Sequence, residues 1–250
     1  MQSGWFDRLH PLTKLSWAIS VAIAAYITPT PWGAWVMMGV AIATPLASAQ
    51  RFTIYRTLFV IFVPIALSLL IIQGLLFPTP GYGRFVIGSF VLELGGLVVA
   101  SINLARIVAL GCGLLSVILT TSSTVLAQSF AERGMPRSIE YILLMALQIL
   151  PDMRQRANAI LEAQQARGLV ITSLPSRVKA LIPLIGPLVV GALIDVEERA
   201  MALEQRAFAS PTPPTRLHHI PDSPWQHRAR TLLLVATGTL ILLRLIGVWA

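Results

Sequence analysis

The sequence predicts an all-α fold, a polytopic integral membrane protein with about five transmembrane helices and two long helices on the cytoplasmic side. Of the 250 residues, 55% are hydrophobic and 12% are charged, and the mean hydropathy is +0.73. Soluble domains carry charge on roughly a quarter of their residues, so this chain is too apolar to be one. Its apolar residues gather into runs near the ~20 residues that a helix needs to cross the hydrocarbon core of a bilayer.

Apolar runs in the first third of the chain predict the first three transmembrane helices. They cover residues 15–27, 32–49 and 57–77. The first run follows a long polar lead-in and lacks a clear small-residue cleavage pattern, so we interpret it as a span of the mature protein and not as a signal peptide.

The next apolar stretch, residues 85–120, is too long for one straight crossing. It is either a tilted or broken helix, or an interfacial piece followed by a span that starts near Leu94, where a Gly-Gly pair offers a break. The last span is predicted at residues 231–249, after a Pro-rich link at 211–224 that a continuous helix cannot cross.

The basic residues predict the orientation of the chain. The formal charge is +8. Basic residues beside apolar spans follow the positive-inside rule, so we predict a lipid bilayer and no nucleic acid as the partner of this charge. Lys and Arg concentrate in the N-terminal segment, in the link between the second and third runs, and in residues 133–230. If the chain crosses the membrane four times before that last segment, all three regions lie on the same side, which the rule identifies as the cytoplasm. We therefore predict a multi-pass protein of the inner (plasma) membrane with a cytoplasmic N-terminus.

These patterns predict four regions. They are the N-terminal transmembrane helices at residues 1–125, a cytoplasmic helical region at 126–210, a Pro-rich linker at 211–230, and a C-terminal transmembrane helix at 231–250.

The cytoplasmic region reads as two amphipathic helices, each finishing in an arginine. The first runs through Pro151 to Arg167, and the second ends near Arg206. One apolar stripe of the second helix repeats at steps of four and three and predicts a buried face, made of Val189, Leu193, Val196, Ala200, Leu203 and Ala207.

Two acid-base pairs in this region have the spacing of ordinary ion pairs within one helix. They are Asp152 with Arg156 and Asp195 with Arg199, each four residues apart. The strongly apolar residues 141–150 and 181–194 are expected to pack against the spans or against each other.

Ionisable residues inside spans usually pair or function. Glu93 is expected either to pair with an arginine or to lie at the membrane interface, and Arg106 to hold spans together or mark the membrane edge. Pro151 joins them as a predicted structural residue. His218, His219, His227 and Asp222 lack the spacing of a metal-binding helix, and the sequence predicts no metal site.

No catalytic residues are predicted. No Ser or Cys is flanked by a plausible base, and Cys112, the single cysteine, has apolar neighbours that favour a core or lipid-facing position. The sequence has no Gly-x-x-x-x-Gly-Lys-Ser/Thr loop to cradle phosphates.

A series of motifs resembles the transmembrane T component of energy-coupling factor (ECF) transporters, the CbiQ-type family. The resemblance covers most of the chain. The motifs are His10-Pro11-Leu12-Thr13-Lys14-Leu15, Arg106, Thr120-Thr121-Ser122, Gly134-Met135-Pro136, Leu150-Pro151, and the endings Glu162-Ala163-Gln164-Gln165-Ala166-Arg167-Gly168 and Ala202-Leu203-Glu204-Gln205-Arg206-Ala207-Phe208. The paired Ala-Arg-Gly-like endings are the most specific part.

The resemblance implies a non-catalytic scaffold. In that family, the T component links two ABC-type ATPase subunits to a small membrane S subunit that captures a vitamin or a metal ion. ATP and Mg are then bound by the partner subunits, and this chain itself binds no cofactor. The two cytoplasmic helices become coupling helices, and the implied ATPase-binding residues are Ala166, Arg167, Gly168, Gln205, Arg206, Ala207 and Phe208.

One residue departs from the family pattern. Ala207 stands where glycine is usual, so the second helix is expected to end differently from the first or to continue a further residue. Without the resemblance, each arginine would simply complement the dipole at a helix C-terminus, an effect of ~0.3–1 kcal/mol. The alternatives for the whole chain are a membrane-embedded enzyme and a conventional permease that binds its substrate itself.

Overall fold

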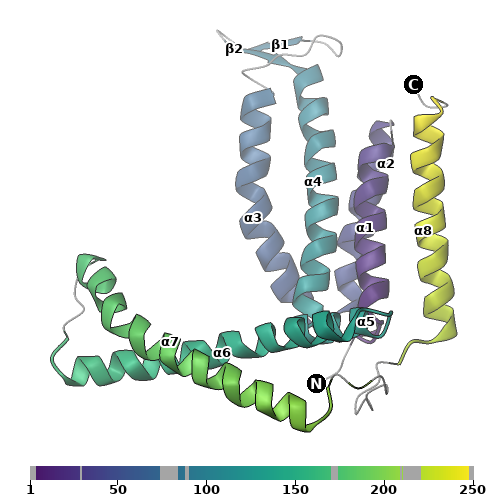
Figure 1. Ribbon diagram of the computed structural model, residues 1–250. Coiled ribbons are helices and arrows are strands. Elements are labelled where there is room, and N and C mark those ends of the chain that lie inside the picture. Colours follow the sequence, from purple (N-terminus) through teal and green to yellow (C-terminus); the bar gives the residue numbers. More distant parts are fainter. Residues whose placement is uncertain are drawn as a thin grey trace. The chain divides into compact units, whose positions relative to one another are not determined.

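The computed structural model describes residues 4–28, 30–73, 84–87, 90–169, 174–208, 210 and 221–247 (Figure 1). The described residues are helical apart from one short hairpin, which confirms the predicted all-α class. They form two compact units, one made of both ends of the chain and the other of its middle. Unit 1 comprises Met1–Gly134 and Ile220–Ala250, and unit 2 is Met135–His219. The four regions drawn from the sequence stay a prediction.

The long helices of unit 1 stand side by side in Figure 1. The central helix α4 packs against α1, α2 and α3, and α8 packs against α1. The elements are α1 (Pro11–Ile27), α2 (Pro31–Ala43), a 3₁₀ turn η1 (Thr44–Ala47), α3 (Arg51–Ile71), α4 (Leu94–Thr120), α5 (Ser123–Ala131) and α8 (Pro224–Leu245).

The helix starts follow local sequence. Helices α1, α2 and α8 begin with proline, whose fixed φ suits a first turn where the backbone N–H would lack a partner. At α1, the Nδ1 atom of His10 accepts a hydrogen bond from the backbone N–H of Leu12. At α5, Ser122 accepts one from Val125 through its hydroxyl oxygen. Part of the His10 to Leu15 motif is therefore a helix cap.

A β-hairpin precedes α4. Strands β1 (Arg84–Ile87) and β2 (Phe90–Glu93) pair antiparallel, with Arg84 opposite Glu93. The expectation of one helix through residues 85–120 is therefore wrong. The alternative expectation, a separate piece followed by a span from Leu94, is correct about where the span starts, but the glycine pair lies in the first turn of α4 and does not break it.

Small residues let the helices of unit 1 approach closely. A methyl group on Gly113 would lie 3.3 Å from the Cβ atom of Ala18 in α1, and one on Gly111 would overlap the ring of Phe62 in α3. Close backbone approach of this kind is typical of packed helices in membranes. Cys112 is fully buried between these contacts, and its thiol donates to the carbonyl oxygen of Ala41 at 3.1 Å.

Two arginines of unit 1 bind the C-terminal end of α1. Arg106 in α4 donates from Nε to the carbonyl oxygen of Ala25 at 3.2 Å and lies over the Tyr26 ring. Arg244 in α8 donates to the carbonyl oxygens of Tyr26 and Ile27 at 2.9 and 2.8 Å. The last carbonyls of a helix have no partner within it, so these guanidinium groups satisfy them and hold three helices together.

Three helices among the described residues are long and apolar enough to cross a bilayer. These segments are Arg51–Ile71, Gly95–Thr120 and Ala180–Gln205, and shorter apolar helices lie at Pro11–Ile27 and Trp32–Ala47. With large apolar side chains exposed along α2, α3 and α8, this pattern supports a multi-pass membrane protein. The third segment belongs to the helix that the sequence analysis placed in the cytoplasm.

Unit 2 is a pair of crossing helices, α6 (Arg137–Ala166) and α7 (Leu174–Gln205), shown in Figure 1. The start of α6 lies beside the end of α7: the Tyr141 and Phe208 rings are 5.3 Å apart, and Arg137 donates to the carbonyl oxygen of Ser210 at 2.8 Å. No residue of α6 is buried.

The acid-base pairs of unit 2 connect the two helices. Arg156 binds Asp195 at 2.8 Å, and Arg199 lies 3.9 Å from Asp152. The expectation that each pair closes within its own helix is therefore wrong: the four residues have exchanged partners across the crossing. Arg199 also donates to the Sδ atom of Met145 at 3.3 Å.

Candidate functional site: two matching helix ends

The first helix end predicted to bind a partner is the C-terminus of α6. The backbone N–H of Gly168 donates to the carbonyl of Gln165, and that of Leu169 donates to the carbonyl of Gln164, both at 3.0 Å. Gly168 has φ of +95°, the left-handed conformation that glycine adopts without steric cost. These two bonds around a left-handed residue define a Schellman cap, which stops the helix sharply after Arg167.

The C-terminus of α7 repeats this geometry residue by residue. The N–H of Ala207 donates to the carbonyl of Glu204, and that of Phe208 donates to the carbonyl of Leu203, again both at 3.0 Å. Ala207 takes the left-handed position with φ of +52°, alone among the described residues other than glycine. The expectation that α7 ends differently or runs further is therefore wrong. The cap forms in spite of a Cβ atom, at a cost of roughly 1–2 kcal/mol.

The two arginines occupy the same place in the two caps. Arg167 and Arg206 are each the last residue before the left-handed one, and both are exposed. Neither guanidinium makes a hydrogen bond or an ion pair with another residue in the described part of the chain. Each is thus a charged, planar donor group presented next to helix carbonyls, available to a carboxylate or carbonyl group of another molecule.

The neighbours of the arginines differ in their surroundings. Ala166, Gly168, Gln205 and Ala207 are exposed, like the arginines. Phe208 is only half-buried, and its ring packs on Tyr141 at the start of α6. This contact fixes the second cap onto the first helix.

The two caps lie at opposite ends of the helix pair. Because Phe208 packs on Tyr141, the α7 cap lies beside the start of α6, whereas the α6 cap lies at its end. At 1.5 Å per residue, the part of α6 between Tyr141 and Arg167 measures about 40 Å. The ion pairs of Arg156 and Arg199 brace the crossing between them.

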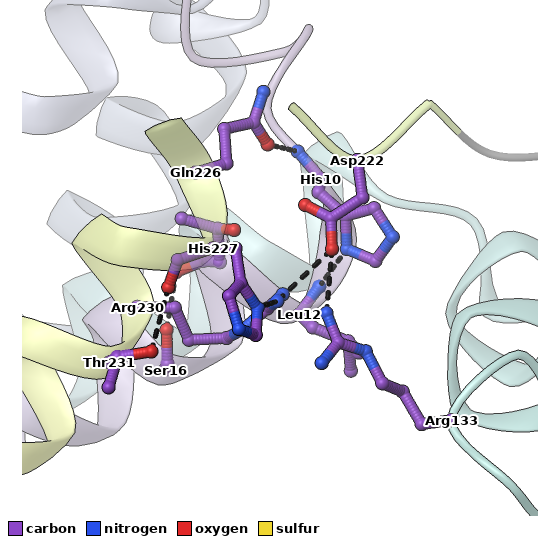
Figure 2. Close-up of polar contacts among 10 residues, drawn as sticks. His10, Leu12, Ser16, Arg133, Asp222, Gln226, His227, Arg230 and Thr231 are labelled. Carbon is purple, nitrogen blue, oxygen red and sulfur yellow. Dashed lines mark hydrogen bonds and ion pairs between the residues drawn. The ribbon is translucent and has the colours of Figure 1, made fainter. Parts of the chain in front are cut away.

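Other residues singled out from the sequence belong to other parts of the structure. Glu93 ends β2, Arg106 binds the end of α1, and Pro151 lies exposed inside α6. Of the four residues that the sequence analysis rejected as a metal site, Asp222 and His227 contact Arg230, at 3.1 and 2.9 Å (Figure 2). The other two, His218 and His219, lie outside the described residues.

Unit 2 also presents a large apolar surface that sequence periodicity did not predict. The stripe of α7 expected to be buried is exposed at Val189, Leu193 and Val196, and Ile182 is 74% exposed. On α6, Ile142 and Leu150 are exposed as well. Exposed apolar surface of this extent is typical of a face that another protein or lipid covers. Which residues of α6 and α7 stay exposed depends on how the two helices pack, so periodicity alone could not identify this apolar surface.

Comparison with known proteins matches the chain to one family. The family model described as cobalt transport protein, CbiQ, matches residues 2–218. The energy-coupling factor transporter transmembrane protein EcfT of Exiguobacterium sibiricum is 34% identical over 67% of this chain and 67% of its own length. The EcfT protein of Listeria innocua is 27% identical over 95% of this chain and 92% of its own length.

Another relative is named for ATP binding. A putative ABC transporter ATP-binding protein of Bifidobacterium longum is 28% identical over 80% of this chain, and the match takes up only 27% of that protein's length.

Proposed function

Because this chain belongs to the CbiQ family, we propose that it is the membrane scaffold of an ECF-type uptake transporter, joining two ABC-type ATPase subunits to a separate S subunit. The chain is then a non-catalytic subunit: its partners bind ATP and Mg and hydrolyse the ATP. The S subunit captures the transported vitamin or metal ion.

The observation that carries this proposal is the repeated cap. Two helix endings with the same cap hydrogen bonds, each presenting an exposed arginine, lie about 40 Å apart on one braced helix pair. A pair of like ATPase subunits offers two like binding sites, and two like handles on a single scaffold match that requirement. The ATP-binding relative adds support, because a region similar to this chain makes up about a quarter of a longer protein that is named for ATP binding.

The exposed apolar face of unit 2 supports the proposal that an S subunit is the third member of the complex. An S subunit is itself a membrane protein, so an apolar helix face is the kind of surface that would contact it. The apolar first half of α7, with Leu181, Ile182, Ile185, Val189 and Val190 each at least half exposed, is the part of unit 2 best suited to it.

The test is co-purification of the full chain with ATP-binding subunits encoded in the same genome. Replacing Arg167 and Arg206 with glutamate should lower the amount of ATPase retained at least tenfold, because losing one partner of a desolvated charge pair costs about 2–5 kcal/mol. Each single variant should retain one ATPase subunit. Arg154→Glu, at an exposed position of α6, serves as the matched control and should assemble normally.

Normal assembly and uptake with the double variant would contradict the proposal. ATP hydrolysis by the chain purified without partners, or tight substrate binding by it alone, would favour the membrane enzyme or the conventional permease instead.

A further inference from the structure

An open groove runs along the outer side of α3 in unit 1, over the first turns of this helix. Its volume is about 450 Å³. The buried residues Ile54 and Leu58 on the other side of the helix belong to the core of unit 1. Three successive turns line the groove, with the residues Phe52, Thr53, Arg56, Thr57, Val60 and Ile61.

Two arginines bring positive charge to this groove. Arg56 lines it, and the guanidinium of Arg51 lies 5.3 Å from the ring centroid of Phe52, another lining residue. Both arginines are exposed, and in the described part of the chain neither guanidinium forms a hydrogen bond or an ion pair. Side chains of a helix tilt toward its N-terminus, so the Arg56 side chain is expected to reach back over the first turn of α3.

The surrounding sequence offers no carboxylate to balance these charges. Between Asp7 and Glu93 there is no acidic residue. Asp7 does reach the connection before α3, but its carboxylate there accepts hydrogen bonds from Ser48 and Ala49, at 2.7 and 2.9 Å. Among the described residues it is paired with neither arginine of the groove. Both guanidinium groups are therefore available to an anionic group of another molecule.

The groove changes from charged to apolar along the helix. Since α3 is long and apolar enough to cross a bilayer, its first turns lie where such a helix meets the lipid headgroups. Val60 and Ile61 lie about one turn deeper than Arg56 and are 65% and 42% exposed. A phospholipid has the same order of groups, a charged phosphate followed by apolar acyl chains.

We propose that this groove binds one anionic phospholipid, with its phosphate at Arg56 and Arg51 and an acyl chain over Val60 and Ile61. The lipid supplies the negative charge that the chain lacks on this face. A lipid without net charge supplies less, because its cationic headgroup amine opposes the arginines. The site goes beyond the proposed function and does not depend on it.

The test measures which phospholipid contacts the groove. The full chain, without partners, carries a bimane fluorophore on Val60→Cys in a Cys112→Ala background and is reconstituted in phosphatidylcholine vesicles. These vesicles contain equal proportions of either brominated phosphatidylglycerol or brominated phosphatidylcholine, because bromine quenches a fluorophore that the acyl chain contacts. The ratio of the two quenching efficiencies should favour phosphatidylglycerol at least fivefold, about the effect of one interfacial basic residue.

Charge variants then show whether Arg56 causes this preference. Arg56→Gln should lower the ratio at least threefold, whereas Arg56→Lys keeps the charge and should retain most of it. Arg228→Gln is the matched control and should leave the ratio unchanged, because Arg228 is also exposed and lies about as near the start of α8. All three variants should keep the thermal stability of the parent in detergent.

A second label position tests whether the preference is local. Leu110 is exposed and lies about as far from the end of α4 as Val60 lies from the start of α3. Bimane on Leu110→Cys should therefore meet acyl chains at a similar depth, but with a ratio near one. The same fivefold ratio at Leu110 would mean that phosphatidylglycerol gathers around the whole protein, and it would overturn the site.

Other outcomes would also overturn the site. Equal quenching by the two lipids at Val60, or an equal loss of preference in Arg228→Gln, contradicts it. Weak quenching by both lipids would show that a protein, such as a second copy of this chain, covers the groove. Loss of the preference in excess inorganic phosphate would identify a site for a free ion. No ATPase is present here, so a failure of the arginine caps would appear only in co-purification.

Discussion

At the scale of single residues, the most informative position is Ala207. An alanine in the left-handed conformation loses free energy that glycine would not, and among the described residues it is alone in doing so outside glycine. The α7 cap nevertheless matches the α6 cap bond for bond. The two backbone bonds of the cap and the packing of Phe208 on Tyr141 therefore outweigh the strain.

Exchanging the residues at the two caps should change local stability in opposite directions. Ala207→Gly removes the strain and should slow amide hydrogen exchange in the last turn of α7 by about 1–2 kcal/mol of opening free energy. Gly168→Ala should speed exchange at the end of α6 by a similar amount.

The control for this exchange is Ala202→Gly, an exposed position inside α7. Glycine there should destabilise the helix by about 1 kcal/mol, the reverse of its effect at Ala207. If Ala207→Gly also destabilised the end of α7, the left-handed cap would not form in solution.

At the scale of elements, the crossing of α6 and α7 depends on pairs that one helix alone does not contain. A spacing of four residues allows an ion pair within a helix, but a second helix at the crossing competes for the same side chains. Asp152 and Asp195 are each bound by the arginine of the opposite helix. These contacts fix the register of the crossing, and hence the distance between the caps.

A charge exchange tests this pairing. Arg156→Glu replaces the ion pair with Asp195, 2.8 Å long, by two like charges. The free energy of unfolding of unit 2 should fall by up to about 1 kcal/mol, a small change because both side chains are partly exposed. Adding Asp195→Arg should restore most of that loss. Thermal unfolding of the four proteins, wild type included, gives the coupling.

Pairing within each helix predicts a different result. Asp195→Arg would then cost the contact with Arg199, and adding Arg156→Glu would not recover it. Arg154→Glu, exposed on the same helix, is the control for a general charge effect.

The sequence predicted what local chemistry determines. The apolar runs, the prolines at helix starts and Gly168 just after Arg167 each follow from neighbouring residues, so the helical class and the first cap could be predicted. The hairpin before α4, the cap at Ala207 and the exchanged ion pairs could not. The exchanged ion pairs and the cap at Ala207 involve contacts with the other helix of the pair, which periodicity does not reveal. The hairpin is local, but a short apolar run does not distinguish a strand from a helix.

At the scale of the whole molecule, the exposed surfaces of unit 1 and unit 2 suit different environments. Large apolar side chains exposed along α2, α3 and α8 suit the hydrocarbon of a bilayer. Unit 2 combines an apolar face with exposed arginines at its two caps. A surface of both kinds suits a region that meets a membrane protein on one face and water-soluble subunits at its ends.

The orientation of the chain is the remaining condition for this arrangement, because ATP is found in the cytoplasm. The connection that carries Gln50 lies beside Arg51 and Arg56, and unit 2 carries many arginines. The hairpin between α3 and α4 carries one basic residue, Arg84. The positive-inside rule therefore predicts Gln50 and unit 2 in the cytoplasm and the hairpin outside.

Single cysteines in the Cys112→Ala background test this orientation with a membrane-impermeant maleimide. Gln50→Cys and Asn158→Cys should be labelled in inverted membrane vesicles and not in intact spheroplasts, while Arg84→Cys should show the reverse pattern. Labelling of Asn158→Cys from the outside would place both arginine caps where no ATP-driven subunit could reach them. In that case the caps could not bind an ATPase, however well their geometry matched.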